Sequence, residues 1–161
     1  MYVGNTQSYA GLGSALVRTS QTYGQQIRLV GRVVGGLQSN LLISLSNRPN
    51  GNCWFAGLDL SGGLAAKLGR PPGLVIGRVI GGVVYVEAAE EAGFALEEGQ
   101  TYELEVETDL TGVFMDLRVR ADGSGWLALP IPVGQTYDGR VGAAAWLSTV
   151  RIDEFNIGVC V

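Results

Sequence analysis

Short apolar runs separated by glycine are the feature that most limits what this chain can fold into. The 161 residues include 25 glycines, which are spread through the whole length. Between the glycines lie short runs rich in valine, isoleucine, leucine and tyrosine. This pattern is typical of many short β-strands joined by tight turns.

The predicted strands fill most of the chain. They lie at residues 15–20, 25–34, 40–46, 53–60, 73–79, 82–87, 100–109, 112–120, 125–131, 139–146 and 149–158. Turn-forming sequences separate them, for example NRPNGN at 47–52 and ADGSG at 121–125. Two segments, GLAAKLG at 63–69 and EAAEEAG at 87–93, have helical character, but each is too short to be a stable helix by itself.

Apolar and polar residues alternate within several of these strands. On QQIRLVGRVV the residues predicted to share one face are Ile27, Leu29, Gly31 and Val33. On TYELEVET the apolar face consists of Tyr102, Leu104 and Val106. The alternation breaks within RIDEFNIGV at residues 152–155, which predicts a β-bulge or a local twist there. A period of two with one polar face indicates antiparallel sheets that cover a core on one side.

These observations predict an all-β fold, a two-sheet antiparallel β-sandwich of the jelly-roll type. We assign residues 25–161 to a single sandwich domain, and residues 1–24 to an N-terminal arm with a first edge strand. The arm is polar and glycine-rich, and it contains Tyr2, Tyr9 and Tyr23. Because tyrosine supplies contact area at low entropic cost, these residues are candidates for docking on a partner. The alternative is a frayed tail beside an edge strand.

Histidine is absent from the chain, and this narrows the available chemistry. Nucleophilic triads of the Ser/His or Cys/His kind are excluded. The two cysteines, Cys53 and Cys160, are too few for an ordinary zinc site. They either pair with each other or remain buried free thiols, and the second state is favoured in a reducing compartment. We expect no cofactor and no bound metal.

Calcium is the one metal for which the sequence offers oxygen ligands near turns. The candidates are Asn50, Asn52, Asp59, Asp109, Asp116 and Asp122. Their spacing matches no known calcium loop, so this site is not predicted.

Charge and hydropathy exclude two classes of partner. The net charge is −4 and the arginines are scattered singly, whereas a nucleic-acid-binding protein usually has a basic excess or a basic stripe. No apolar run reaches the ~18 residues of a membrane-spanning helix. The N-terminal sequence MYVGNTQSYAGLGSA lacks the basic and apolar regions of a signal peptide, so we expect synthesis in the cytoplasm.

The second half of the chain resembles the concanavalin A-like lectin/glucanase superfamily, which includes laminin G-like domains. The resemblance is carried by GQTYELEVETD, VFMDLRVR, GRVGAAAW and VRIDEFNIG. It extends over residues 94–161 and is looser over residues 25–93. It implies a jelly roll, and it implies carbohydrate recognition as one possible activity, although fold alone does not fix function.

The ELEVE sequence of Glu103, Glu105 and Glu107 raises the question of catalysis, because laminarinase-type glucanases in this superfamily carry Glu-x-Asp-x-Glu on one strand. A retaining glycosidase needs two carboxyl groups about 5–5.5 Å apart, close to the spacing of alternate strand residues. The middle residue departs from the glucanase motif, however. We interpret the three glutamates as the solvent face of a strand, paired across to Arg118 and Arg120.

Three tryptophans are candidates for sugar binding, namely Trp54, Trp126 and Trp146. Exposed aromatic rings would serve as platforms for a sugar, and the alternative is that each packs at the core or its rim.

The main prediction is a non-catalytic structural or docking module. We expect a homo-oligomer, for example a trimer, that joins a larger assembly such as a bacteriophage particle, as a capsid decoration or tail protein. The alternative is a lectin-like carbohydrate-recognition domain, and a glucanase-type hydrolase comes third.

Overall fold

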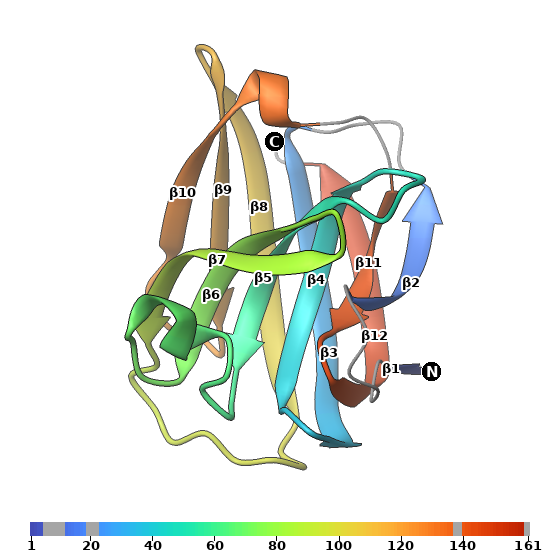
Figure 1. Ribbon diagram of the computed structural model, residues 1–161, viewed down its shortest axis with the longest axis vertical. Coiled ribbons are helices and arrows are strands. Elements are labelled where there is room, and N and C mark those ends of the chain that lie inside the picture. The colour runs from blue at the N-terminus through green and yellow to red at the C-terminus, as the bar shows by residue number, and fades with distance from the viewer. Residues whose placement is uncertain (5–11, 19–22, 137–139, 160–161) are drawn as a thin grey trace.

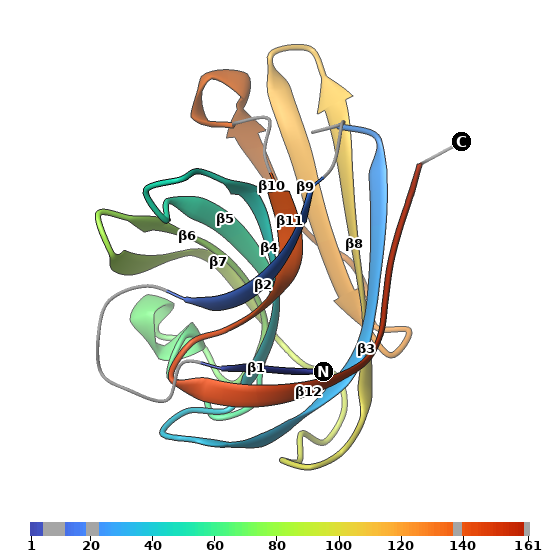
Figure 2. The ribbon, with the colours of Figure 1, turned by 90° about the vertical axis from the view of Figure 1, so that its right-hand side faces the viewer.

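The computed structural model describes residues 1–4, 12–18, 23–136 and 140–159; for residues 13–18 it describes the backbone alone. It consists of two six-stranded antiparallel sheets packed face to face (Figures 1 and 2). The predicted β-sandwich is therefore confirmed. No helix in these residues is long and apolar enough to cross a membrane.

In spatial order, the first sheet contains β1 (Tyr2–Gly4), β12 (Ser148–Val159), β3 (Gln25–Gly36), β8 (Tyr102–Thr111), β9 (Phe114–Ala121) and β10 (Leu127–Pro132). The second contains β2 (Gly13–Arg18), β11 (Arg140–Ala145), β4 (Asn40–Asn47), β5 (Cys53–Asp59), β6 (Gly73–Ile80) and β7 (Val83–Glu91). The chain crosses between the sheets at its two ends, over β1 to β4 and β10 to β12, while β4 to β7 stay in one sheet and β8 to β10 in the other. Crossing connections of this kind are typical of a jelly roll. Two short 3₁₀ helices, η1 (Ala65–Leu68) and η2 (Val133–Gln135), lie in the connections.

All eleven predicted strands occur, within a few residues of their expected bounds, as β2 to β12. The predicted irregularity in the last strand is confirmed, because the pairing of β12 with β3 shifts register between Ile152 and Glu154. The helical character of EAAEEAG is wrong, since β7 continues through this segment to Glu91 and pairs with β6. The GLAAKLG segment forms only the single turn of η1.

The main core lies between the sheets and follows the predicted alternation. Tyr102, Leu104 and Val106 of β8 are fully buried, as are Ile27 and Leu29 of β3. Trp54, Ile76 and Ala143 belong to the same cluster from the second sheet. Burial of this apolar area is the main force holding the two sheets together.

A second apolar cluster lies on the other face of the second sheet. Phe55, Val75 and Leu42 are fully buried there, because the segment around η1 folds back over the sheet and contributes Leu64 and Ala65. Asp59, buried at the end of β5, holds this segment in place by accepting hydrogen bonds from the N–H groups of residues 62, 64 and 65 at 2.8–3.1 Å. The second sheet therefore has apolar residues on both faces.

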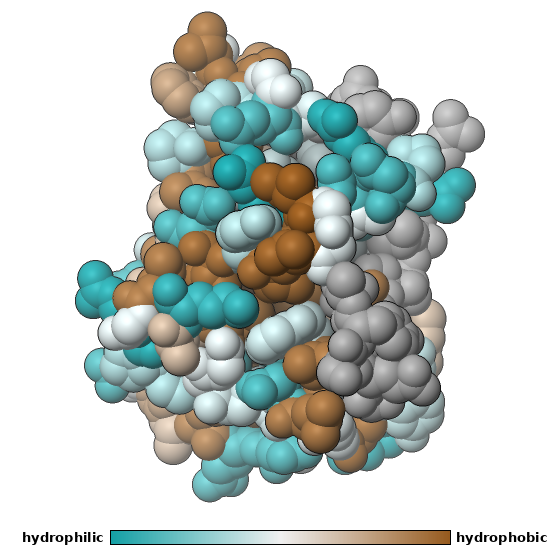
Figure 3. Space-filling model, viewed as in Figure 1, coloured by the Kyte–Doolittle hydropathy of each residue, from teal (hydrophilic) through white to brown (hydrophobic). Residues whose placement is uncertain are grey.

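The β8–β9 hairpin projects beyond the sandwich and ends in an apolar tip. Leu110, Val113 and Phe114 are between 42% and 71% exposed at this end. Figure 3 shows the tip as brown atoms at the top of the molecule.

Glycine is required where strands of the second sheet approach closely. A Cβ atom on Gly57 of β5 would lie 2.2 Å from the carbonyl oxygen of Leu41 and 2.8 Å from Cα of Leu42. Gly57→Ala should therefore lower the free energy of unfolding by roughly 1–3 kcal/mol, through forced movement of β4. Urea unfolding followed by tryptophan fluorescence measures this change.

Gly134→Ala is the matched control, because a Cβ atom at this position would meet no heavy atom within 4 Å. Its unfolding free energy should stay within about 0.5 kcal/mol of the unsubstituted protein. Equal losses in the two variants would contradict the close approach at Gly57.

Candidate functional site

The glutamates of ELEVE lie on the outer face of the first sheet, opposite the buried face of β8. The exposed fractions of the Glu103, Glu105 and Glu107 side chains are 39%, 21% and 18%. They alternate with fully buried residues, as the sequence predicted. The row is therefore part of the solvent-facing surface of a sheet.

Each of these glutamates is paired with an arginine on a neighbouring strand. Register places Glu105 opposite Arg120 and Glu107 opposite Arg118, and both pairs form ion pairs. Arg120 donates from Nε to Glu105 at 2.8 Å. Glu103 instead pairs with Arg28 of β3, with 2.7 Å between Nε and the carboxylate.

The electrostatics of Glu103 do not suit a general acid. Hydrogen bonding to the Arg28 guanidinium lowers the pKa of Glu103 below its usual 4.5. A glycosidase acid needs a carboxyl group whose pKa is raised. The ion pairs therefore favour a structural role for this row, in which opposite charges stabilise the cross-strand register.

A cation of the same chain lies over each of the three tryptophan rings. Arg78 is 5.3 Å from the ring centre of Trp54, and Lys67 is 5.5 Å from that of Trp146. Arg118 and Arg120 lie 4.9 and 4.4 Å from the ring centre of Trp126.

Burial further limits the tryptophans as sugar platforms. Trp54 is only 5% exposed, and its indole N–H donates to the carbonyl of Gln135. Trp126 and Trp146 are partly buried. The rings predicted as sugar platforms are therefore already engaged by cation–π contacts within the chain.

The predicted docking tyrosines fall in three different environments. Tyr2 is 65% exposed on β1, which pairs with β12 of its own domain. Tyr23 packs against the main core, and its hydroxyl lies 2.8 Å from that of Thr136. Tyr9 lies outside the described residues. Of the three, Tyr2 is therefore the one shown to be available to a ligand or partner.

Most of the oxygen ligands considered for calcium are occupied by backbone N–H groups. Side-chain oxygens of Asn50, Asn52, Asp59, Asp109 and Asp122 accept such hydrogen bonds. In the part of the chain that the structure describes, no three acidic, cysteine or histidine side chains converge on a common point.

Cys53 is a free thiol buried in the second apolar cluster. Burial raises its pKa to about 12, so the thiol stays protonated and unreactive. Cys160 lies outside the described residues.

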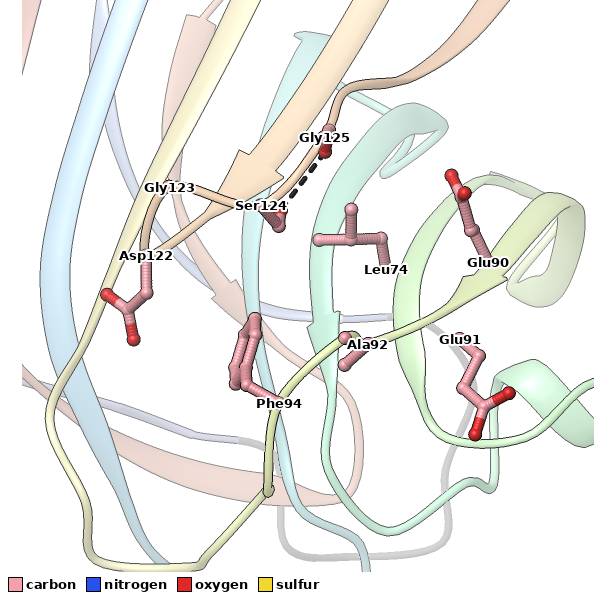
Figure 4. Close-up of a pocket in the computed structure, with 10 residues that line it drawn as sticks. Leu74, Glu90, Glu91, Ala92, Phe94, Asp122, Gly123, Ser124 and Gly125 are labelled. Carbon is pink, nitrogen blue, oxygen red and sulfur yellow. Dashed lines mark hydrogen bonds between the residues drawn. The ribbon is translucent and has the colours of Figure 1, made fainter.

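The candidate ligand site is a pocket where the two sheets separate at one end of the sandwich. Its volume is about 460 Å³, within the range of small-molecule sites. One wall is the end of β7 with the segment that follows it, including Glu90, Glu91 and Phe94 (Figure 4). The other wall is the turn between β9 and β10, residues 122–125.

The pocket offers an aromatic ring together with free polar groups. Figure 4 shows the Phe94 ring between the two walls, with Leu74 and Glu90 on the β7 side. Glu90 and Glu91 are exposed, and their side chains make no hydrogen bond or ion pair with any described residue. Their carboxylates are therefore available to accept hydrogen bonds from a ligand.

Both walls of the pocket are held in place before any ligand binds. The Tyr102 hydroxyl accepts a hydrogen bond from the Glu97 N–H at 2.7 Å and also contacts the Glu97 carbonyl, and this fixes the segment after β7. The Phe94 ring packs on the Tyr102 ring, 6.1 Å between centres. In the opposite turn, Asp122 accepts from the Glu103 N–H.

No sequence pattern indicated this pocket. Its walls come from segments about thirty residues apart, which the jelly-roll connectivity brings together. Glu90 lies in the segment 87–93, for which helical character was predicted, and Phe94 directly follows that segment. Alternation alone does not show where two sheets separate.

Comparison with known proteins finds similarity in fold and not in sequence. No protein-family profile and no curated protein sequence matches this chain. A carbohydrate-binding module from Bacillus subtilis, CBM66, superposes with a TM-score of 0.60 and 12% identity, over 93% of this chain and 96% of its own. Lactose- and MES-liganded congerin II superposes with a TM-score of 0.61 and 12% identity, over 90% of this chain and 99% of its own.

A toad ovary galectin in complex with thio-digalactose gives a TM-score of 0.58 and 10% identity, over 94% of this chain and 100% of its own. These likenesses extend over whole domains. They show that the chain shares the jelly-roll sandwich fold of these three structures.

The ion pair between Glu103 and Arg28 should be visible in the pH dependence of stability. Because the folded-state pKa of Glu103 is lowered, its carboxylate contributes stability above the ordinary pKa of 4.5. That contribution is lost as the pH falls through the folded-state value. The difference in unfolding free energy between the unsubstituted protein and Glu103→Gln should therefore shrink between neutral pH and about pH 2.

Urea titrations across this range measure the effect, with Glu98→Gln as the control. Glu98 is exposed and forms no ion pair with any described residue. Its substitution removes a carboxylate without removing an ion pair, so it controls for the loss of one negative charge. If the difference in unfolding free energy for Glu103→Gln stays constant over this pH range, the Glu103–Arg28 ion pair contributes nothing to stability.

Proposed function

We propose that this protein is a carbohydrate-binding module without catalytic activity, and that its ligand site is the pocket between β7 and the β9–β10 turn. The observation that carries the proposal is the pocket itself: a preformed site with one aromatic ring and free carboxylates, on a fold shared with sugar-binding proteins. Fold alone does not specify function, so the chemistry of the pocket has to support the same conclusion.

The pocket has the composition that a sugar ring requires. A sugar has an apolar face of C–H groups and a rim of hydroxyl groups. The Phe94 ring suits the apolar face, while the carboxylate of Glu90 and the backbone of residues 123–125 suit the hydroxyls. Because the walls are already fixed, binding costs little ordering entropy.

The negative charge of the pocket limits its ligands to neutral or cationic sugars. Glu90 and Glu91 form no ion pair with the residues that the structure describes, and Asp122 lies on the opposite wall. A carboxylate or sulfate on the ligand would meet like charges in this space. We therefore infer that the pocket binds neutral sugars such as galactosides or glucosides, or amino sugars.

The structural-module hypothesis stays a prediction. The superposed structures concern sugar-binding proteins, and nothing in them bears on a bacteriophage particle. Homo-oligomer formation likewise stays a prediction, for which light scattering is the measurement.

A glycan array followed by calorimetry with the best neutral oligosaccharide tests the proposal. Glu90→Gln keeps the shape of the side chain and removes its charge, and Phe94→Ala removes the ring. Each should weaken binding by at least about tenfold, equivalent to about 1.4 kcal/mol. Circular dichroism checks that both variants are folded.

Two variants remove the same groups outside the pocket. Phe114→Ala removes an exposed ring at the β8–β9 tip, and Glu98→Gln removes an unpaired carboxylate. Both should bind the oligosaccharide as the unsubstituted protein does. The proposal fails if the array detects no glycan, or if the pocket variants bind as tightly as these two.

A further inference from the structure

Most arginines on the outer face of the first sheet form ion pairs, and Arg32 does not. Asp109 and Asp116, directly opposite each other on β8 and β9, also lack an ion pair with a described residue. Arg28, Arg118 and Arg120 each form an ion pair with a glutamate. Arg32 of β3 forms no ion pair or hydrogen bond through its side chain with the described residues. Its Nε is the one buried side-chain polar atom, among those described, that lacks a hydrogen bond. Buried polar atoms in this state are rare and call for an explanation.

Strand register places a second arginine beside Arg32, which makes the lack of an acidic partner for Arg32 more unfavourable. Arg32 is directly opposite Arg151 of β12, and Arg151 is directly opposite Tyr2 of β1. The next residues on these strands, Val33, Val150 and Val3, are buried. Tyr2, Arg151 and Arg32 therefore form one row across the outer face, which we call the Arg32 row. Like charges directly opposite on paired strands are unfavourable.

Neighbouring acidic groups relieve this repulsion only in part. Arg151 has Asp153 3.3 Å from its Nε, and this partner lies at the bulge of β12. Glu154, on the far side of the bulge, pairs with Arg28. No described residue accepts a hydrogen bond from the terminal guanidinium nitrogens of Arg32 and Arg151. These nitrogens, and not the buried Nε of Arg32, are the donors that remain for a ligand.

The row has the chemistry of a site for a carboxylate. A guanidinium presents N–H donors in a planar fork that matches a carboxylate in bidentate geometry. Two such groups on adjacent strands can share one carboxylate, which would also remove their mutual repulsion. The Tyr2 ring, 65% exposed, ends the row and offers an apolar surface beside the charged groups.

We propose that the Arg32 row binds the carboxylate of an acidic sugar, a uronic acid residue within a glycan, at a site separate from the pocket. Arg32 and Arg151 hold the carboxylate, and the Tyr2 ring packs against the sugar ring. The choice of a glycan as ligand rests on the proposed function. An acidic peptide would satisfy the arginines but would make no particular use of the ring.

The pocket and the Arg32 row differ in charge and therefore favour different ligands. Among the described residues, the pocket carboxylates of Glu90 and Glu91 have no ion pair, and neither does the Arg32 guanidinium. A uronic acid is repelled from the first and attracted to the second. A glycan containing both neutral and acidic residues could therefore use both sites.

Calorimetry with a trimer of galacturonic acid, at low ionic strength, tests the inference. Arg32→Ala should weaken binding of this trimer by at least about tenfold, a size typical of a lost charge-assisted contact. Arg32→Lys, which keeps the charge without the fork, should recover only part of the affinity. Arg70→Ala is the control, because Arg70 is exposed, makes no ion pair with a described residue, and changes the net charge equally.

Equal losses for Arg32→Ala and Arg70→Ala would show a general effect of charge and would overturn the inference. So would a polyglutamate peptide that binds as tightly as the trimer, because the site would then recognise peptides. Failure of the pocket is distinguishable from failure of this row. The pocket variant Glu90→Gln should leave the galacturonate affinity unchanged, and Arg32→Ala should leave the binding of a neutral oligosaccharide unchanged.

Unfolding measurements separate a binding role from a structural role. Arg32→Met removes the buried Nε and one of two like charges, so in the absence of ligand its Tm should equal or exceed that of the unsubstituted protein. A saturating concentration of the galacturonic acid trimer should raise the Tm of the unsubstituted protein and should not change the Tm of Arg32→Met. A Tm lower in Arg32→Met than in Arg70→Met would show that Arg32 supports the fold, against the proposal.

Discussion

Tyr102 is the residue on which both the core and the pocket depend. Its ring is fully buried between the sheets, and its backbone pairs with Gly31 of β3. A buried hydroxyl needs a partner, and this one finds it in the backbone of Glu97. Packing of β8 into the core therefore also fixes the segment that forms one wall of the pocket. In this way an ordinary requirement of burial orders a surface site.

The two faces of the first sheet show how one alternating pattern serves two purposes. The inner residues of β8 and β3 supply apolar area, and the outer residues supply a row of ion pairs. Exposed ion pairs contribute little energy individually, but here they link β8 to both of its neighbours, directly opposite between β8 and β9 and diagonally between β3 and β8. They therefore support the pairing of these strands, whereas Arg32 has no such partner among the described residues.

The sequence was sufficient for the strands and for the faces of β3 and β8, because alternation and turn residues are local signals. It was insufficient for β1, which has only three residues, and for the end of β7, where alanine and glutamate favour a helix. Pairing of Leu74 with Glu90 and of Gly73 with Glu91 overrides that preference. The pocket and the Arg32 row depend on which strands become neighbours, and this is decided by tertiary packing.

The first two strands occupy edges of different sheets. β1 covers one side of β12, and β2 covers one side of β11. A proteolytic cut or a mutation that detaches this segment would leave two backbones with unpaired N–H and C=O groups, one on each layer. Exposed edges of that kind recruit strands from other molecules. By covering the edges of β11 and β12, β1 and β2 thus protect these two strands from pairing with other molecules.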